Sequence, residues 1–325
     1  MILRAPGFWA QDGVVPRLLL PFSAITAVLT AHRVAKPGWR APVPVICCGN
    51  ATVGGTGKTT VVQELARRLP GVHLLTRGYR GYARYLKRVE LDDPYALVGD
   101  EALLLARVAP TWRCADRAVS AKAAVEAGAT ALLMDDGLQN PTLVKTASLL
   151  IIDGETGFGN GRVLPAGPLR EPVEAAASRC QAAIIIGNDE KNVRALLPLG
   201  MTVLQADLMQ DEAIRRVIGK RILPFAGIGR PEKFFKPLRE AGAIVVATKA
   251  FPDHYPYMPV EWRDLLQQAA DLDARLVTTP KDAVRLPPEV LDHVTVIGVG
   301  LRWRDPAALD EFLGKVLMKE PVGVP

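Results

Sequence analysis

Gly49-Asn50-Ala51-Thr52-Val53-Gly54-Gly55-Thr56-Gly57-Lys58-Thr59-Thr60 is the stretch that decides the fold of this chain. It follows the apolar run Val43 to Cys48 and precedes a helix-like stretch, Val61 to Leu69. A buried strand, a glycine-rich turn and a helix start, in this order, form a phosphate-binding loop. The glycines let successive backbone N–H groups point at phosphate oxygens, and the helix N-terminus adds a partial positive charge. The sequence therefore predicts a nucleotide-binding protein.

Two side chains of this loop have predicted tasks. Lys58 is expected to reach the β- and γ-phosphates, and the Thr59 hydroxyl is expected to hold Mg²⁺. Thr52 stands where the usual pattern has its first glycine, which is the one visible departure. The predicted nucleotide-binding residues are Thr52, Val53, Gly54, Gly55, Thr56, Gly57, Lys58, Thr59 and Thr60.

A second nucleotide-site signature lies further along the chain. The apolar stretch Ala129 to Met134 ends in Asp135-Asp136-Gly137, which is typical of a buried strand that delivers a carboxylate to the magnesium ion. Adjacent aspartates repel each other unless a cation lies between them, so the pair favours a metal role over a solvated turn. Thr59, Asp135 and Asp136 are the predicted metal ligands, and the sequence leaves open which aspartate touches the metal directly.

The fold class follows from the alternation of short apolar strands with helices. Apolar runs such as Leu149 to Ile152 and Ala182 to Ile186 read as buried strands. This pattern predicts an α/β fold of the P-loop NTPase type, with a mostly parallel, doubly wound sheet.

From about residue 200 the strand and helix pattern restarts, which predicts a second, smaller α/β domain. We expect residues 201–208 and 298–303 to connect the two units. The predicted division is a kinase core over 1–205 with an N-terminal helix at about 14–33, a C-terminal helix 305–318 that returns to this core, and a smaller domain over 210–300 that closes the cleft.

The composition and net charge limit the classes of partner that we expect. A net charge of +6 and a pI near 9.2 favour anionic partners. The few aromatic residues are not interleaved with basic ones, so we expect no nucleic acid partner. The four cysteines show neither metal-ligand spacing nor a disulfide framework, which fits a reducing cytoplasm.

An uncharged, mostly apolar stretch covers residues 18–31 and is shorter than the ~20 residues that cross a bilayer as a helix. On a helix, apolar and hydroxyl side chains would separate onto two faces, and cations flank the stretch. Two interpretations stay open from these residues: a helix lying in a membrane interface, or one packed on the protein's own core. The apolar face comprises Leu18, Phe22, Ile25 and Leu29, and the hydroxyl face comprises Ser23, Thr26 and Thr30.

Several polar segments follow predicted strands, where the ligand crevice of an α/β sheet opens. The basic loop Arg77 to Tyr82 is either a solvated face or a contact with an anionic substrate. Asp100 is either a helix N-cap or a proton acceptor. Asp253 and His254 are expected to form one polar cluster with residues 278–282 in a cleft between the units.

Taken together, these segments resemble the tetraacyldisaccharide 4′-kinases, also called lipid A 4′-kinases. The similarity runs in order over most of the chain. Leu138, Thr60 and Pro280 differ from residues frequent in the family; these departures leave the expected chemistry untouched, and Pro280 is the one expected to alter a loop, the one that carries Lys281. The matching segments are Gly49-Asn50, Thr52 to Thr59, Arg77-Gly78-Tyr79, Val98 to Glu101, Asp135 to Gln139, Gly157 to Gly161, Leu164 to Glu171, Ala226 to Pro231, Phe251 to His254, Thr278-Thr279 and Lys281-Asp282.

The resemblance implies transfer of the ATP γ-phosphate to the 4′-hydroxyl of an acylated glucosamine disaccharide 1-phosphate, giving lipid IVA. It also implies Mg²⁺, two α/β/α domains, and peripheral attachment of a monomer to the cytoplasmic face of a Gram-negative inner membrane. By resemblance, Asp100 and His254 act together as proton acceptor, Asp253 orients the histidine, and Lys58 is catalytic. Substrate binding is expected at Arg77, Gly78, Tyr79, Asn160, Arg170 and Glu171.

Other classes fit the sequence less well. Switch ATPases of the P-loop group carry a signature lysine where this chain has Val53. A soluble small-molecule kinase or ligase, such as a dethiobiotin synthetase relative, would not need the apolar N-terminal stretch or the second α/β unit. A scaffold protein would not need Asp100, the Asp135-Asp136 pair and the Asp253-His254 pair together.

Overall fold

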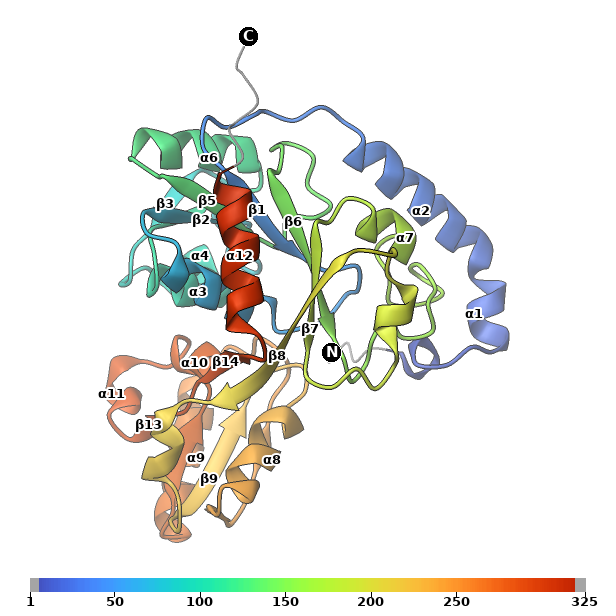
Figure 1. Cartoon of the computed structure of the whole chain (residues 1–325). Coiled ribbons are helices and arrows are strands. Elements are labelled where there is room, and N and C mark those ends of the chain that lie inside the picture. Colours follow the sequence, from blue (N-terminus) through green and yellow to red (C-terminus); the bar gives the residue numbers. More distant parts are fainter. Residues whose placement is uncertain (1–5, 319–325) are drawn as a thin grey trace.

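A computed structural model describes residues 6–318. The chain forms a larger and a smaller α/β unit, each built on a sheet of mostly parallel strands that helices cover (Figure 1). The fold class predicted from the sequence is therefore confirmed.

The larger unit is built on a nine-stranded sheet with the order β14-β8-β7-β6-β1-β5-β2-β4-β3. Only the two edge strands, β3 and β14, run antiparallel to their neighbours. Cys48 at the end of β1 pairs in register with Asp135 at the end of β5, so both strands deliver their next residues to the same sheet edge. The strands are β1 (Val45–Gly49), β2 (Val72–Thr76), β3 (Lys87–Val89), β4 (Thr111–Arg113), β5 (Ala131–Asp135), β6 (Ala147–Asp153), β7 (Ala182–Ile186), β8 (Thr202–Gln210) and β14 (Val299–Trp303).

Helices pack on this sheet through apolar stripes. In α3, Val61, Val62 and Leu65 are fully buried, because their spacing places them on one face of the helix. The last helix, α12, packs Leu309 and Leu313 into the same core cluster. The helices of this unit are α3 (Lys58–Arg68), α4 (Tyr95–Val98), α5 (Asp100–Ala106), α6 (Arg117–Glu126), α7 (Val173–Ala177) and α12 (Pro306–Leu317).

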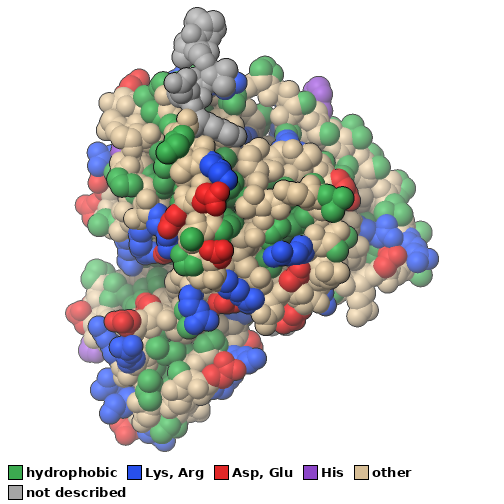
Figure 2. Space-filling model, viewed as in Figure 1, with side chains coloured by type: hydrophobic (Ala, Val, Ile, Leu, Met, Phe, Trp, Pro, Cys, Tyr) green, Lys and Arg blue, Asp and Glu red, His purple; other side chains and the backbone are tan. Residues whose placement is uncertain are grey.

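The smaller unit has a five-stranded sheet in which every strand pair is parallel. Alternate residues of β9 point to opposite faces, so Ile222 joins a core with Phe235 while Leu223 joins another with Leu265. Basic side chains gather over this unit and at its junction with the larger one (Figure 2). The elements are β9 (Arg221–Ala226), α8 (Glu232–Glu240), β10 (Ile244–Val245), β11 (Lys249–Ala250), α9 (Pro259–Asp271), β12 (Arg275–Thr278), α10 (Pro280–Ala283), α11 (Pro288–Leu291) and β13 (Val294–Val296).

The chain passes to the smaller unit and back through adjacent strands. The two segments expected to connect the units are β8 and β14, which pair with each other at one edge of the large sheet. Where they leave that sheet, the Asp211 N–H donates to the Gly298 carbonyl at 3.0 Å, and the Gly298 N–H donates to Asp211 Oδ2 at 2.8 Å. The crossing is therefore a closed, hydrogen-bonded neck.

The N-terminal helices α1 (Val14–Leu18) and α2 (Leu20–Val34) run along the outside of the larger unit beside α7 (Figure 1). The hydroxyl face of α2 points inward: Ser23 is 5% exposed and donates to the Val163 carbonyl at 2.7 Å, and Thr30 is also buried. The apolar face points outward. No helix among the described residues is long and apolar enough to span a membrane. The exposed apolar side chains of the two helices are Val14, Val15, Leu18, Leu20, Phe22, Ile25, Val28 and Leu29.

Candidate active site

The glycine-rich loop joins β1 to α3 with the geometry expected of a phosphate-binding loop. Gly57 caps α3 in the left-handed region, with φ +79°, where a side chain would be strained and its Cβ would lie 2.8 Å from Ile186 Cδ1. Asn50, which is buried at the end of β1, donates to the hydroxyls of Thr52 and Thr56 at 3.3 Å each. The start of the loop is therefore fixed from inside, while Gly54 and Gly55 are exposed to a ligand.

The proline- and glycine-rich segment before α7 supports the same loop. The Val53 N–H donates to the Pro168 carbonyl at 2.8 Å, and the Arg170 N–H donates to the Ala51 carbonyl at 2.6 Å. Asn160 uses its amide within this region, donating to the carbonyls of Phe8 and Ala166 and accepting from the Arg162 N–H. In this structure Asn160 thus shapes the segment that braces the phosphate-binding loop.

The two adjacent aspartates after β5 have different surroundings. Asp136 accepts hydrogen bonds from both terminal guanidinium nitrogens of Arg170, at 3.0 and 3.2 Å, and its carboxylate lies 4.0 Å from the Lys58 ammonium. Burial opposes ionisation of Asp136, but the charges of Lys58 and Arg170 lower its pKa. Asp135 is fully buried, and burial together with Glu101 and Asp136 raises its pKa to about 7.

Asp135 also carries a carboxylate oxygen, Oδ1, that is buried without a hydrogen-bond partner. An unpartnered buried carboxylate oxygen fits a hard cation such as Mg²⁺, which takes oxygen ligands. No group of three or more metal-binding side chains occurs among residues 6–318. Where Mg²⁺ binds beside substrate phosphates, one or two carboxylates and the phosphates themselves usually hold it.

Asp100 and His254 meet across the junction of the two units. Asp100 Oδ2 lies 2.8 Å from His254 Nδ1, although the residues are 154 positions apart in the chain. The N-cap of α5 is Gly99, so the capping interpretation of Asp100 was wrong. His254 has a left-handed backbone with φ +59°, a conformation uncommon outside glycine and frequent at functional sites.

Two cations lie beside this pair: Lys281, which belongs to the segment 278–282 expected to cluster with Asp253 and His254, and Arg285, which was not predicted for the site. Arg285 is 1% exposed, and its Nε lies 3.1 Å from Asp100 Oδ2. The Lys281 ammonium lies 3.2 Å from His254 Nε2, 3.3 Å from Glu101 Oε1 and 3.5 Å from Asp253 Oδ1. Burial opposes the ionisation of Asp100, whereas the His254 hydrogen bond, Lys281 and Arg285 lower its pKa. The only sequence signal for Arg285 is its spacing, one helical turn after Lys281.

Asp253 is less closely engaged with the histidine than Asp100 is. Its Oδ2 lies 3.7 Å from His254 Nε2, which is beyond hydrogen-bond distance. In this structure the carboxylate that hydrogen-bonds the His254 ring is that of Asp100, and the ring's other nitrogen contacts Lys281. Asp253 instead pairs with Lys281 and is 44% exposed at the mouth of the site.

The basic loop after β2 contributes Tyr79 to the same place. The Tyr79 ring meets His254 edge-on, with ring centroids 5.4 Å apart. Gly78 allows this approach, because a Cβ there would lie 2.1 Å from Arg113 Nε, and its φ of +66° is left-handed. Arg77 and Tyr79 are exposed, so both are open to a ligand.

A third contact between the units reaches the phosphate-binding loop itself. Arg230, just before α8, donates to the Gly55 carbonyl at 3.2 Å and also bonds the Asp153 carboxylate at the end of β6. Lys233 bonds the same carboxylate at 2.9 Å and lies 2.8 Å from Glu155 Oε2. The smaller unit therefore places two cations beside the loop predicted to hold the nucleotide.

The sequence profile of the tetraacyldisaccharide-1-P 4′-kinase family matches residues 15–318. The chain belongs to this family. Among its relatives, the tetraacyldisaccharide 4′-kinase of Gluconacetobacter diazotrophicus is 52% identical over 324 residues, covering 98% of this chain and 99% of that protein. The tetraacyldisaccharide 4′-kinase of Gluconobacter oxydans is 47% identical and covers 96% and 98%. That of Rhodospirillum rubrum is 45% identical and covers 97% and 98%.

A solved structure of similar fold is LpxK from Aquifex aeolicus, described as an "apo" form in complex with ATP. It superimposes with a TM-score of 0.77, covers 94% of this chain and all of that chain, and is 24% identical in sequence. This likeness supports the fold of a tetraacyldisaccharide 4′-kinase. The family resemblance inferred from the sequence is thus confirmed.

Proposed function

We propose that this chain is an ATP-dependent kinase that phosphorylates the 4′-hydroxyl of tetraacyl-disaccharide 1-phosphate, giving lipid IVA in lipid A biosynthesis. The observation that supports this most directly is the Asp100–His254 pair at the junction of the two units. A phosphate-binding loop alone fits any nucleoside triphosphatase. A buried carboxylate–imidazole pair is an arrangement that can accept a hydroxyl proton, which a phosphate-binding loop does not supply.

Phosphoryl transfer needs mainly positioning and neutralisation of charge. The loop from Thr52 to Thr60 supplies backbone N–H groups for the phosphates, and Lys58 supplies a cation. Arg230 and Lys233 stand beside the same loop from the smaller unit. We propose that they contact the triphosphate when the two units, acting as domains, close on it.

In this proposal, Asp100 and His254 together accept the proton of the substrate hydroxyl. The neighbouring cations that lower the Asp100 pKa also make its carboxylate a weak base on its own. His254 supplies an imidazole beside this carboxylate, and its Nδ1 contact with Asp100 fixes the orientation of the ring. The substrate hydroxyl proton would therefore pass to the pair late, as the new P–O bond forms.

The residues present fit Mg²⁺. Asp135 would hold the ion directly, because its Oδ1 is unpartnered while both oxygens of Asp136 are occupied by Arg170. Thr59, in the first turn of α3, would complete the protein ligands. When bound, Mg²⁺ neutralises charge on the β- and γ-phosphates.

Substrate contact is proposed for the exposed Arg77 and Tyr79 and for the Arg170–Glu171 segment. The acyl chains need an apolar landing surface, which the outward face of α1 and α2 offers. We propose that this face lies in the membrane interface, at the cytoplasmic side of the inner membrane, and that the protein acts there as a monomer. The inward hydroxyl face of α2 supports this arrangement, because it leaves the apolar side chains toward solvent.

The deciding experiment is transfer of labelled γ-phosphate from Mg²⁺-ATP to the acylated disaccharide 1-phosphate in detergent micelles. We expect label in the lipid, its loss in Lys58→Ala, and at least a ~10²-fold lower kcat in Asp100→Asn with ATP binding retained, the usual scale for a catalytic base. Lys220→Gln, a charge change on the exposed surface of the smaller unit, is the matched control. ATP hydrolysis without labelled lipid would contradict the proposal and favour a switch ATPase.

A further inference from the structure

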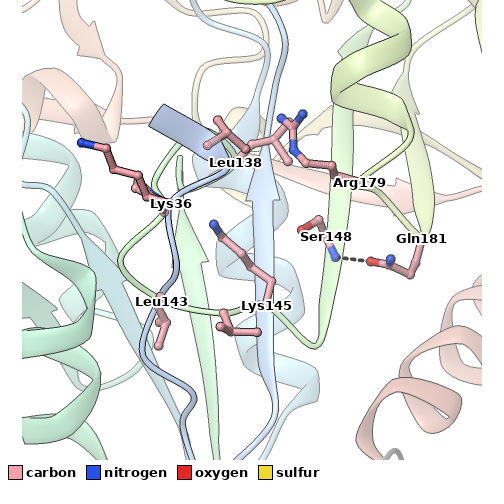
Figure 3. Close-up of a pocket in the computed structure, with 11 residues that line it drawn as sticks. Lys36, Leu138, Leu143, Lys145, Ser148, Arg179 and Gln181 are labelled. Carbon is pink, nitrogen blue, oxygen red and sulfur yellow. Dashed lines mark hydrogen bonds between the residues drawn. The ribbon is translucent and has the colours of Figure 1, made fainter. Parts of the chain in front are cut away.

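A cavity of about 230 Å³ lies beside the C-terminal end of α2, apart from the phosphate-binding loop (Figure 3). Its wall comes from three parts of the chain: residues 34–38 after α2, the β5–β6 connection, and the starts of β6 and β7. The β5–β6 connection is firmly placed, because Trp39 N–H donates to the Thr142 carbonyl at 2.8 Å and Val144 N–H to the Trp39 carbonyl at 2.9 Å. The cavity is thus a formed feature of the fold.

Every charged side chain that lines this cavity is cationic: Lys36, Lys145 and Arg179. Lys145 and Arg179 point their charged groups toward the same space, while Lys36 stands at the rim (Figure 3). None of the described residues that line the cavity is acidic. Ser148 and Gln181 complete the polar wall and bond each other, with the Ser148 N–H donating to Gln181 Oε1 at 2.7 Å.

The two cations differ in how far their charge is compensated: Arg179 is paired with Glu171, whereas Lys145 is not paired with a carboxylate among the described residues. Lys145 donates to the Asn140 carbonyl and forms no ion pair within the described part of the chain. Burial lowers the pKa of Lys145, the Cys47 thiol acts in the opposite direction, and the nearby Arg179 and Arg117 lower it further. Arg179 donates through Nη2 to both carboxylate oxygens of Glu171, at 2.8 and 2.7 Å, and through Nη1 to the Ala175 carbonyl, so Nε and the remaining N–H of Nη1 are the donors left for a ligand. An anion placed between the two would relieve their repulsion.

We propose that this cavity binds the phosphate group of an anionic ligand, held by Lys145 and Arg179 and closed at the rim by Lys36. A membrane phospholipid headgroup is the expected source. The last residue of α2, Val34, lines the cavity, and the exposed cations Arg33, Lys36 and Arg40 lie at or just after this end of the helix. Only this choice of source rests on the proposed membrane attachment, and the phosphate chemistry does not.

The test measures how fast a single amine reacts. The full-length protein is reductively methylated with formaldehyde, and the labelling rate of each lysine is followed by peptide mass spectrometry. Three additions are compared: inorganic phosphate, phosphatidylglycerol vesicles, and vesicles of an uncharged galactolipid. A ligand at ten times its Kd is expected to slow labelling of Lys145 about tenfold. Lys220 is the internal control, and Lys58 reports separately on the phosphate-binding loop.

Protection of Lys145 by phosphatidylglycerol, beyond that given by galactolipid, would support the site with a lipid headgroup as ligand. Protection by inorganic phosphate alone would support it with free phosphate. Equal protection by both kinds of vesicle, or none by any addition, would overturn it.

Arg179→Gln should abolish the protection and Arg179→Lys should keep it. Because the Arg179 change also removes the Glu171 ion pair, Lys36→Gln serves as a second variant and should weaken protection without that loss. A failed phosphoryl-transfer assay with Lys145 still protected would refute only the proposed function.

Discussion

The outward apolar face of α2 makes a quantitative prediction. Phe22, Ile25 and Leu29 are 58%, 57% and 65% exposed, so the folded protein leaves more than half of each in water. We consider the triple variant Phe22→Ser, Ile25→Ser and Leu29→Ser. Full burial of such a side chain contributes about 1.5–3 kcal/mol, so burying the exposed parts in a membrane interface contributes roughly 3–5 kcal/mol in total.

This free energy corresponds to a loss of about 10²- to 10³-fold in the vesicle partition coefficient of the triple variant. Co-sedimentation with phosphatidylglycerol vesicles over a range of lipid concentrations measures it directly. Thermal unfolding should change little, because substitutions of exposed residues usually alter stability by less than about 0.5 kcal/mol. A large fall in the unfolding midpoint would mean that the face is packed in solution.

A matched control removes comparable exposed apolar surface elsewhere: Leu199→Ser, Ile218→Ser and Val260→Ser, at positions that are 104%, 50% and 62% exposed. The control triple should bind vesicles as the wild type does. If both triples bind alike, or if the α2 triple keeps wild-type binding, the membrane role of α2 is refuted.

Three further predictions concern the junction of the two units. Arg230→Ala removes the guanidinium that contacts the Gly55 carbonyl and should lower kcat/KM for ATP about tenfold or more, whereas Arg230→Lys should retain part of the wild-type value. Steady-state kinetics measures both variants, and an unchanged kcat/KM in the alanine variant would contradict the role of Arg230. Arg285→Met leaves the buried Asp100 carboxylate without its guanidinium partner and should cost about 3–5 kcal/mol in chemical denaturation, and a cost under about 1 kcal/mol would contradict the charge pairing described. Burial opposes ionisation of Asp153, but Lys233 and Arg230 lower its pKa below the reference value of 3.8. The stability that the ionised Asp153 contributes is therefore fully present above pH 3.8 and is lost as the pH falls through the lowered pKa. Between about pH 5 and about pH 3, the unfolding midpoint of Asp153→Asn should therefore fall less steeply than that of the wild type. Parallel curves would count against this.

Short sequence patterns predicted the features that depend on residues near one another in the chain. The phosphate-binding loop and the Asp135-Asp136 pair each follow a buried strand, and parallel strands bring their carboxyl ends to one sheet edge. Their proximity could therefore be predicted before any coordinates. The Asp100–His254 contact, between residues 154 positions apart, was available only from the family resemblance, because no periodicity encodes a contact across two units.

The orientation of α2 shows where pattern reading stops. Its two faces were evident from the 3.6-residue period, but the period does not say which face packs inward. Which face packs inward depends on the Val163 carbonyl, which is 140 positions away in the chain and accepts the hydrogen bond of the Ser23 hydroxyl. Arg285 escaped prediction for a related reason. An arginine one helical turn from a lysine looks like surface charge until the fold buries it against Asp100.

The neck formed by β8 and β14 makes the smaller unit an insertion in a complete domain. Asp211 and Gly298, where the chain leaves and re-enters, are hydrogen-bonded to each other, so a short turn could join Gln210 to Val299 with the nine-stranded sheet intact. Segments with such adjacent ends are the ones that gene fusion can exchange as cassettes between relatives. A chimera that keeps the large unit of a relative and takes the insert of this chain would receive His254, Lys281 and Arg285 together, as one transferable half of the proposed proton-accepting site.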